Sequence, residues 1–148
     1  MLRLNLKTEP YWMDLPGKVK VKVRPVSTAI MSAAQSIALE QYRKLMEEKG
    51  LDGENDAMRK GISESILVKS LAGLAIIEWD GVLQADGEKP AAISEKTISD
   101  LMDIWVVAQD FLQKYVTQVK ILETEGNSSA PAVSGTSAEE ARTAKGAA

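Results

Sequence analysis

The stretch Tyr11-Trp-Met-Asp-Leu15, Pro16-Gly17, Lys18-Val-Lys-Val-Lys-Val-Arg24 decides the first part of the fold. Its second half alternates valine with Lys and Arg, the period-2 pattern of a strand with one apolar and one cationic face. Pro16-Gly17 favours a tight turn, because proline presets a negative φ and glycine accepts a positive one. We therefore expect Tyr11–Leu15 and Lys18–Arg24 to pair as an antiparallel hairpin.

The cations at positions 18, 20, 22 and 24 allow two interpretations. They can form an anion-binding strand. Alternatively, they can be solvated side chains at a sheet edge that prevent pairing with another strand. The chain has 18 Lys and Arg against 21 Asp and Glu, a formal net charge of −3. This balance favours the solvated face and gives no reason to expect binding to nucleic acid or to an anionic membrane. Leu2, Leu4 and Leu6 alternate in the same way and predict one more strand.

Helical spacing of apolar residues predicts helices after Pro25. Ser27 is a good N-cap for the first helix and Gly50 a good C-cap, and Ser94 is a good N-cap for the third. A glycine inside the second helix, Gly73, is expected to let another helix approach closely. The last two helices are either separate or one bent helix, since neither proline nor glycine lies between them. The predicted ranges are Thr28–Lys49, Asp56–Trp79, Glu95–Met102 and Trp105–Glu123.

From Gly126 onward the residues are small and polar, with Val133 the one sizeable apolar side chain. Such a segment buries too little apolar surface to offset about 1–2 kcal/mol of ordering entropy per residue. The predicted fold class is mainly α with a small N-terminal antiparallel β-sheet (α+β). We expect one globular domain over residues 1–125, with residues 1–25 β-rich and residues 27–125 helical. Residues 126–148 are predicted to be a disordered tail or linker.

The chain contains no histidine and no cysteine. This removes the commonest general acid/base, the commonest transition-metal ligand and the best nucleophile. We therefore predict a non-catalytic protein with no catalytic residues, no cofactor and no metal site. A small hydrolase built on the carboxylates of Glu64, Glu78 or Asp80 is the competing hypothesis, although no nucleophile or metal cluster accompanies them.

Several short blocks occur in a recognisable order. They are Leu4-Asn-Leu-Lys-Thr-Glu-Pro-Tyr-Trp-Met-Asp-Leu15, Val19-Lys-Val-Lys-Val-Arg-Pro-Val26, Ile76-Ile-Glu-Trp-Asp-Gly-Val82, Asp86-Gly-Glu-Lys-Pro90 and Glu123-Thr-Glu-Gly-Asn-Ser-Ser129 before a Ser/Gly/Ala tail. This order resembles the small tail assembly chaperones of long-tailed bacteriophages, prophages and phage-like particles. The likeness runs over most of residues 1 to 135, and it is carried by pattern and short motifs.

The resemblance implies a chaperone that coats apolar segments of the tape measure protein, the long helical ruler of the tail. It also implies recruitment of tail tube subunits, a location in the bacterial host cytoplasm, and absence from the mature virion. In relatives a ribosomal frameshift adds a second domain, and residues 126–148 lie where such a linker would be. The alternative is a structural virion component such as a head–tail connector or a tail completion protein. Self-association is left open.

A chaperone of this kind needs an apolar groove that accepts client helices through anchors at i, i+3, i+4 and i+7. Methionine and tryptophan suit such a groove, because one is adaptable and the other offers a large contact area. The same residues also suit ordinary core packing, and the tryptophans alternatively suit a stacking platform for nucleotides or carbohydrate. The residues predicted to bind the client are Met31, Met46, Met58, Trp79, Met102 and Trp105.

Overall fold

A computed structural model describes residues 7–50 and 54–126 of the chain, with side chains up to residue 116. The chain divides into two units. One is Lys7–Tyr115, and the other combines Met1–Leu6 with Val116–Ala148. The strand expected at Leu2, Leu4 and Leu6 and residues 127–148 of the expected tail lie outside the described residues, whereas Gly126, the expected start of that tail, is the last residue of a helix. The sheet and the helices up to Tyr115 belong to the first of these units.

The predicted hairpin is confirmed. Strand β1 (Tyr11–Leu15) pairs antiparallel with β2 (Val19–Val23), with Met13 opposite Val21. Gly17 and Lys18 form the turn with positive φ angles of 83° and 62°. One face of this hairpin is apolar and buried, as the alternation of valine with lysine requires.

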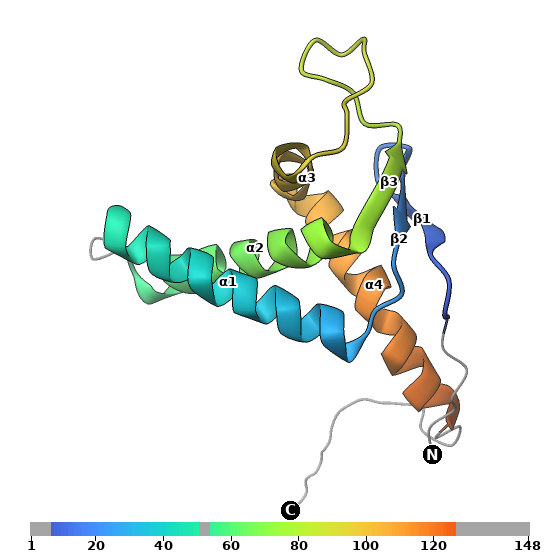
Figure 1. Cartoon of the computed structure of the whole chain (residues 1–148), viewed down its shortest axis with the longest axis horizontal. Helices are drawn as coiled ribbons and strands as arrows, with labels where there is room; N and C mark the ends of the chain where they lie inside the picture. The colour runs from blue at the N-terminus through green and yellow to red at the C-terminus, as the bar shows by residue number, and fades with distance from the viewer. Residues whose placement is uncertain (1–6, 51–53, 127–148) are drawn as a thin grey trace, which may run out of the picture. The chain divides into compact units, whose positions relative to one another are not determined.

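Helix α1 (Thr28–Glu48) begins at the predicted N-cap, where the Ser27 hydroxyl accepts a hydrogen bond from the Ile30 amide at 3.1 Å. It ends at Glu48 with Lys49 as the C-cap, and the predicted capping glycine, Gly50, follows with a φ of 67° and donates its amide to the Met46 carbonyl. Helix α2 (Asp56–Ala75) follows, capped by the Asn55 side chain. Figure 1 shows the two helices side by side as an antiparallel pair that extends away from the sheet.

The prediction that the second helix continues to Trp79 is wrong. The helix ends at Ala75, and Ile76–Asp80 form strand β3, which pairs antiparallel with β2 to give the sheet order β1-β2-β3. Residues 27–125 are therefore not wholly helical. The physical reason is tertiary: β2 needs a partner on its second side, and Ile76, Ile77 and Trp79 are β-branched or aromatic residues that suit a sheet. Opposite charges also face each other, with Lys20 beside Asp80.

The expected role of Gly73 is not found. A Cβ built at this position meets no atom within 4 Å, so no other helix of the described chain approaches it closely. By contrast, Gly81 after β3 has a φ of 87° and lies against the Lys18 carbonyl, where a side chain would collide with backbone. Gly81 is thus the glycine that a close approach requires.

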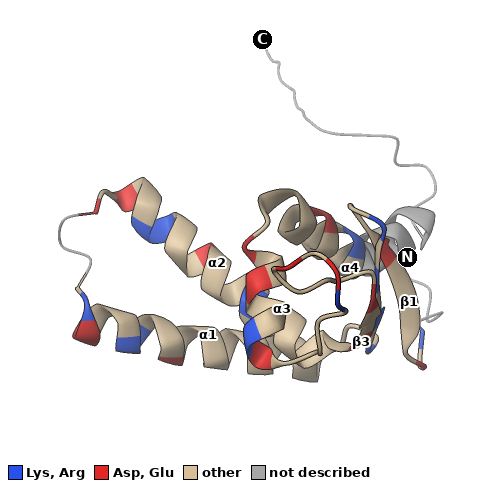
Figure 2. Ribbon diagram, turned by 90° about the horizontal axis from the view of Figure 1, so that it is seen from above, with Lys and Arg blue, Asp and Glu red and all other residues tan. Residues whose placement is uncertain are grey.

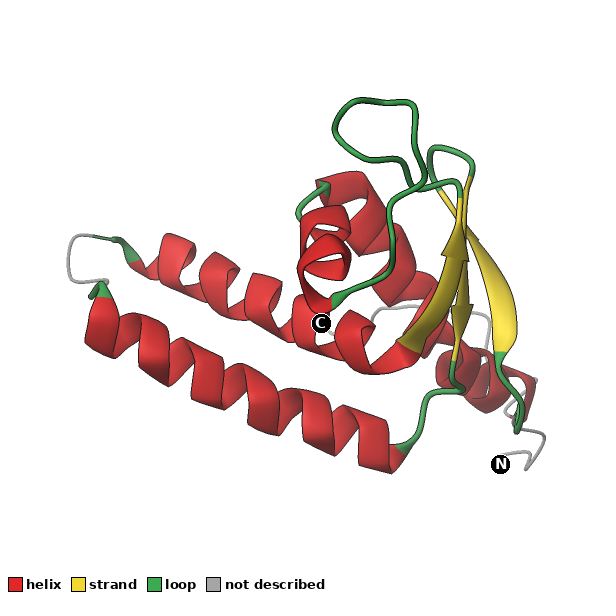
Figure 3. Ribbon diagram, turned by 45° about the horizontal axis from the view of Figure 1, so that its top comes forward, coloured by secondary structure: helices red, strands yellow, loops and turns green. Residues whose placement is uncertain are grey.

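Helix α3 (Glu95–Met102) and helix α4 (Trp105–Gly126) are separate, which resolves the alternative of one bent helix. Figure 3 shows the long loop that joins β3 to α3. The loop is closed on itself by a bridge between Leu83 and Pro90 and by the Trp79 indole, which donates to the Ala91 carbonyl at 2.9 Å.

The core lies between the apolar face of the sheet and helices α2, α3 and α4. Val21 and Val23 of the sheet are fully buried in one cluster with Leu71, Phe111 and Tyr115. Phe111 and Tyr115 stack with ring centroids 5.3 Å apart. The Tyr115 hydroxyl donates to the Arg24 carbonyl at 2.7 Å, so α4 is tied to the end of β2. Burial raises the pKa of Tyr115 well above its usual value of 10.0.

Candidate functional site

Three consecutive exposed apolar residues, among them the most exposed tryptophan of the described chain, lie where α3 meets α4. Ile104, Trp105 and Val106 are 51%, 69% and 53% exposed. Exposed apolar patches on soluble proteins often mark interaction sites. This junction is therefore the candidate functional site.

A hollow of about 350 Å³ lies beside Trp105, between α2 and the α3–α4 segment. We call it the Trp105 groove. Its floor includes the buried side chains of Val68 and Met102, and Trp105 stands at its rim. It is lined by Gly61, Glu64, Ser65, Val68, Met102, Asp103, Trp105, Ala108, Gln109 and Leu112.

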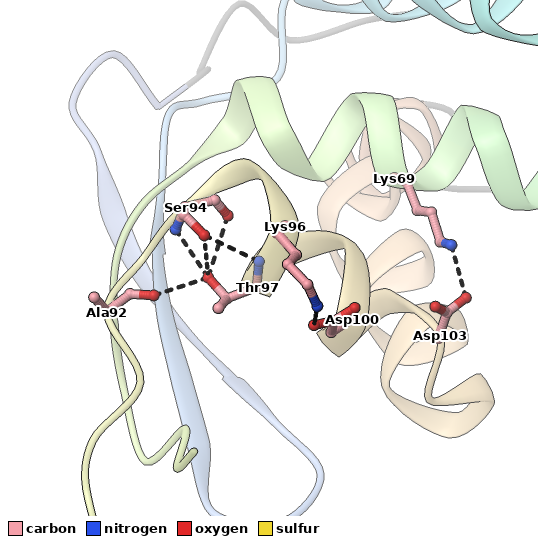
Figure 4. A network of polar contacts seen from close by, with 7 residues as sticks. All are labelled: Lys69, Ala92, Ser94, Lys96, Thr97, Asp100 and Asp103. Atoms are coloured by element: carbon pink, nitrogen blue, oxygen red, sulfur yellow. Dashed lines mark hydrogen bonds and ion pairs between the residues drawn. The ribbon is translucent and has the colours of Figure 1, made fainter. Parts of the chain in front are cut away.

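Local structure holds this junction in place. Asp103 ends α3 with its amide bonded to the Ser99 and Asp100 carbonyls, and its carboxylate pairs with Lys69 of α2 at 2.7 Å. Figure 4 shows this ion pair beside the network at the start of α3. Asp103 and Ile104 form the short connection between the two helices, and Trp105 is the first residue of α4.

The start of α3 is fixed by a capping box. The Ser94 hydroxyl accepts from the Thr97 amide at 3.1 Å, and the Thr97 hydroxyl accepts from the Ser94 amide at 2.9 Å. Lys96 pairs with Asp100 one turn along the same helix, as Figure 4 shows. These contacts fix the first turns of α3, the helix that leads to Trp105.

The structure brings some of the six predicted binding residues together. Met102 and Trp105 both line the Trp105 groove. Met58, about half exposed, lies on α2 two helical turns before Ser65 of that groove, which places both on the same side of α2.

The other three predicted residues lie elsewhere. Met31 is half-buried against the core. Met46 is exposed near the end of α1. Trp79 is on β3, where its indole N–H donates a hydrogen bond to the Ala91 carbonyl.

A second, larger hollow of about 610 Å³ involves residues that the sequence reasoning missed. We call it the aliphatic groove. It lies between α1, α2, β3 and α3, and its apolar lining residues are Ile37, Leu74, Ile76, Ile77, Ile93 and Ile98, together with Gly73. None of its lining residues is a methionine or a tryptophan. The signal present was the isolated Gly73 inside an apolar helix.

The outward face of the sheet carries paired charges. Lys20 lies 3.7 Å from Asp14, and Lys22 lies 3.5 Å from Glu78, each across neighbouring strands. Figure 2 shows red and blue residues mixed on the strands at this end of the unit. Two of the four strand cations are thus matched by carboxylates, as on an ordinary solvated sheet face.

The carboxylates of the hydrolase hypothesis do not form one constellation. Glu64 is on α2 and lines the Trp105 groove, whereas Glu78 and Asp80 are on β3. Glu78 is paired with Lys22. In residues 7–50 and 54–126, no group of three or more acidic side chains is arranged to hold a metal ion. None of the helices described is both long and apolar enough to cross a membrane.

Comparisons with protein-family models, with curated proteins and with solved structures give no match to this chain.

Proposed function

We propose that this chain is a non-catalytic assembly chaperone that binds apolar helical segments of a phage tape measure protein and helps recruit tail tube subunits. The observation that carries the proposal is the exposed apolar junction of Ile104, Trp105 and Val106 above a preformed groove. An apolar groove on a small helical domain is suited to accept amphipathic helices.

The identity of the client comes from the order of sequence blocks described above, which resembles tail assembly chaperones. The absence of His and Cys from the chain agrees with a binding role, although it excludes no carboxylate chemistry. A chaperone acts before the particle is complete, so it belongs to the host cytoplasm and leaves the finished virion. These expectations distinguish it from a head–tail connector or a tail completion protein, which would remain in the particle.

The test is co-expression with the protein encoded immediately downstream, followed by tagged pull-down and measurement of the soluble fraction. We expect a long helical protein to become soluble only in the presence of this chain and to co-purify with it. The chain should then be missing from purified particles. A chain that ignores this neighbour and is found in finished particles would be a structural component.

A pair of tryptophan variants sharpens the same experiment. Trp105→Ala removes the most exposed tryptophan of the candidate site, and Trp12→Ala removes a tryptophan that is 49% exposed on the outward face of the sheet. Both should fold, because neither side chain belongs to the core. We expect only Trp105→Ala to lower the yield of soluble client.

A further inference from the structure

We infer that the Trp105 groove binds one amphipathic α-helix of a partner protein that carries Lys or Arg beside its apolar anchors. The inference rests on the proposed function, which supplies a helical client, and it adds the place of binding and the charge of the bound segment. Three features of the groove support the inference. They are its buried apolar floor with an exposed tryptophan at the rim, its length and its charge.

The groove combines a closed floor with an open rim. Val68 and Met102 are buried and form a packed floor, while Trp105 at the rim is 69% exposed and available for contact with a ligand. Buried aromatic anchors surrounded by smaller contacts carry most of the binding energy in protein interfaces. A partner that covers Trp105 and Leu112 would remove both from water.

The length of the groove matches a short helix. Gly61, Ser65 and Val68, which line the groove, follow one another on one side of α2 at spacings of four and three residues. From Gly61 to Val68 this stripe extends about 10 Å, at 1.5 Å per helical residue. A bound helix with anchors at i, i+3 or i+4, and i+7 covers about 10 Å, so three successive anchors fit.

The charged side chains of the groove are acidic. Among the ten lining residues, all within the described chain, Glu64 and Asp103 are the charged ones. Asp103 is paired with Lys69. The exposed carboxylate of Glu64 therefore gives the lining of the groove a negative charge. Charge complementarity then favours a partner with basic flanking residues.

The aliphatic groove offers no such preference. Its charged lining residues are Lys69, Lys96 and Glu95, which are of both signs. Both lysines are already paired, with Asp103 and Asp100. The Trp105 groove is therefore the surface whose occupant is specified by charge as well as by shape.

The test uses synthetic 14-residue helices labelled with fluorescein, each with leucine at i, i+3 and i+7, and with either Lys or Glu on the flanks. Fluorescence anisotropy with the full chain measures Kd at low and high salt. We expect the Lys-flanked helix to bind about tenfold more tightly at low salt, with the difference shrinking as salt screens the charges. Glu64→Lys should abolish this preference, whereas Glu47→Lys on α1, outside the groove, should leave it unchanged.

Tryptophan variants locate the binding. Trp105→Ala should weaken binding of the Lys-flanked helix about tenfold or more, and Trp12→Ala should not change it. Equal effects of the two variants, or equal affinity for the two helices, would overturn the inference. Loss of a self-associated form in Trp105→Ala by sedimentation velocity, without an effect on peptide binding, would show that a second copy of the chain fills the groove, and would overturn it too.

These outcomes are separable from those of the proposed function. If folded Trp105→Ala still solubilises the downstream protein, the groove assignment fails and the chaperone function stands. If the wild-type chain binds the Lys-flanked helix through Trp105 but does not solubilise that protein, the groove assignment stands and the proposed client is wrong.

Discussion

Replacing Gly73 by alanine should stabilise the protein. Gly73 lies inside α2, has no positive φ, and a Cβ added there meets nothing within 4 Å. The substitution therefore creates no collision, and it reduces the conformational freedom of the unfolded chain. Glycine in a helix interior costs about 0.5–1 kcal/mol relative to alanine, so the free energy of unfolding should rise by this amount.

The same reasoning applies to Gly61, which is also in α2 and also has open space around its Cβ. The two sites are separated by about 18 Å along the helix, so their effects should add. The double variant Gly61→Ala/Gly73→Ala is then expected to gain about 1–2 kcal/mol. For a chain of this size each kcal/mol corresponds to about 3 °C in Tm.

The assay is urea denaturation followed by circular dichroism at 222 nm, with the slope m expected to stay constant. Gly81→Ala is the matched control. Its positive φ and its contact with the Lys18 carbonyl predict a loss of about 2 kcal/mol or more. A destabilised Gly73→Ala would refute the reasoning, because it would mean that the surface over this part of α2 is occupied.

Four further substitutions test the core and the start of α3. Phe111→Ala should lower the free energy of unfolding by about 3–5 kcal/mol, because the ring is fully buried between the sheet and Tyr115; a loss below 1 kcal/mol in urea denaturation would contradict that packing. Tyr115→Phe should cost about 1 kcal/mol at pH 7, since it removes the hydrogen bond to the Arg24 carbonyl. Because the folded-state pKa of Tyr115 is raised above 10.0, its contribution is complete below pH 10 and is lost as pH rises further, so the stability difference from Tyr115→Phe should shrink in denaturation series above pH 10. Ser94→Ala should cost about 1 kcal/mol and Glu95→Ala less, as thermal melts would show, because Ser94 caps α3 through the Thr97 amide.

Local signals in the chain were sufficient for most element boundaries. The alternation of Val19, Val21 and Val23, together with the turn at Gly17, predicted the β1–β2 hairpin, because pattern and turn geometry act over neighbouring residues. Ser27 and Ser94 predicted the starts of α1 and α3 because a capping side chain satisfies amides only three positions away.

Strand β3 could not be predicted from neighbouring residues alone. The run from Leu71 to Ile77 is apolar throughout, and such a run fits a buried helix as well as a buried strand. The decision was made by β2, a strand distant in sequence, which offers its second edge to Ile76–Asp80 and opposes Lys22 to Glu78. Alternation of Ile77 and Trp79 with acidic residues before Asp80-Gly81 was the signal that could have indicated a strand.

The sequence by itself determined the hairpin, the helix starts, the lack of His and Cys chemistry, and the residue types suited to an apolar site. Only the tertiary structure decided which of these residues share a surface. Met102 and Trp105 line one groove with Val68 of α2, whereas Met31 and Trp79 lie against the core. The reason is physical: residue type sets how much a side chain gains from leaving water, but the packing of α2 against α3 and α4 sets which side chains are left exposed.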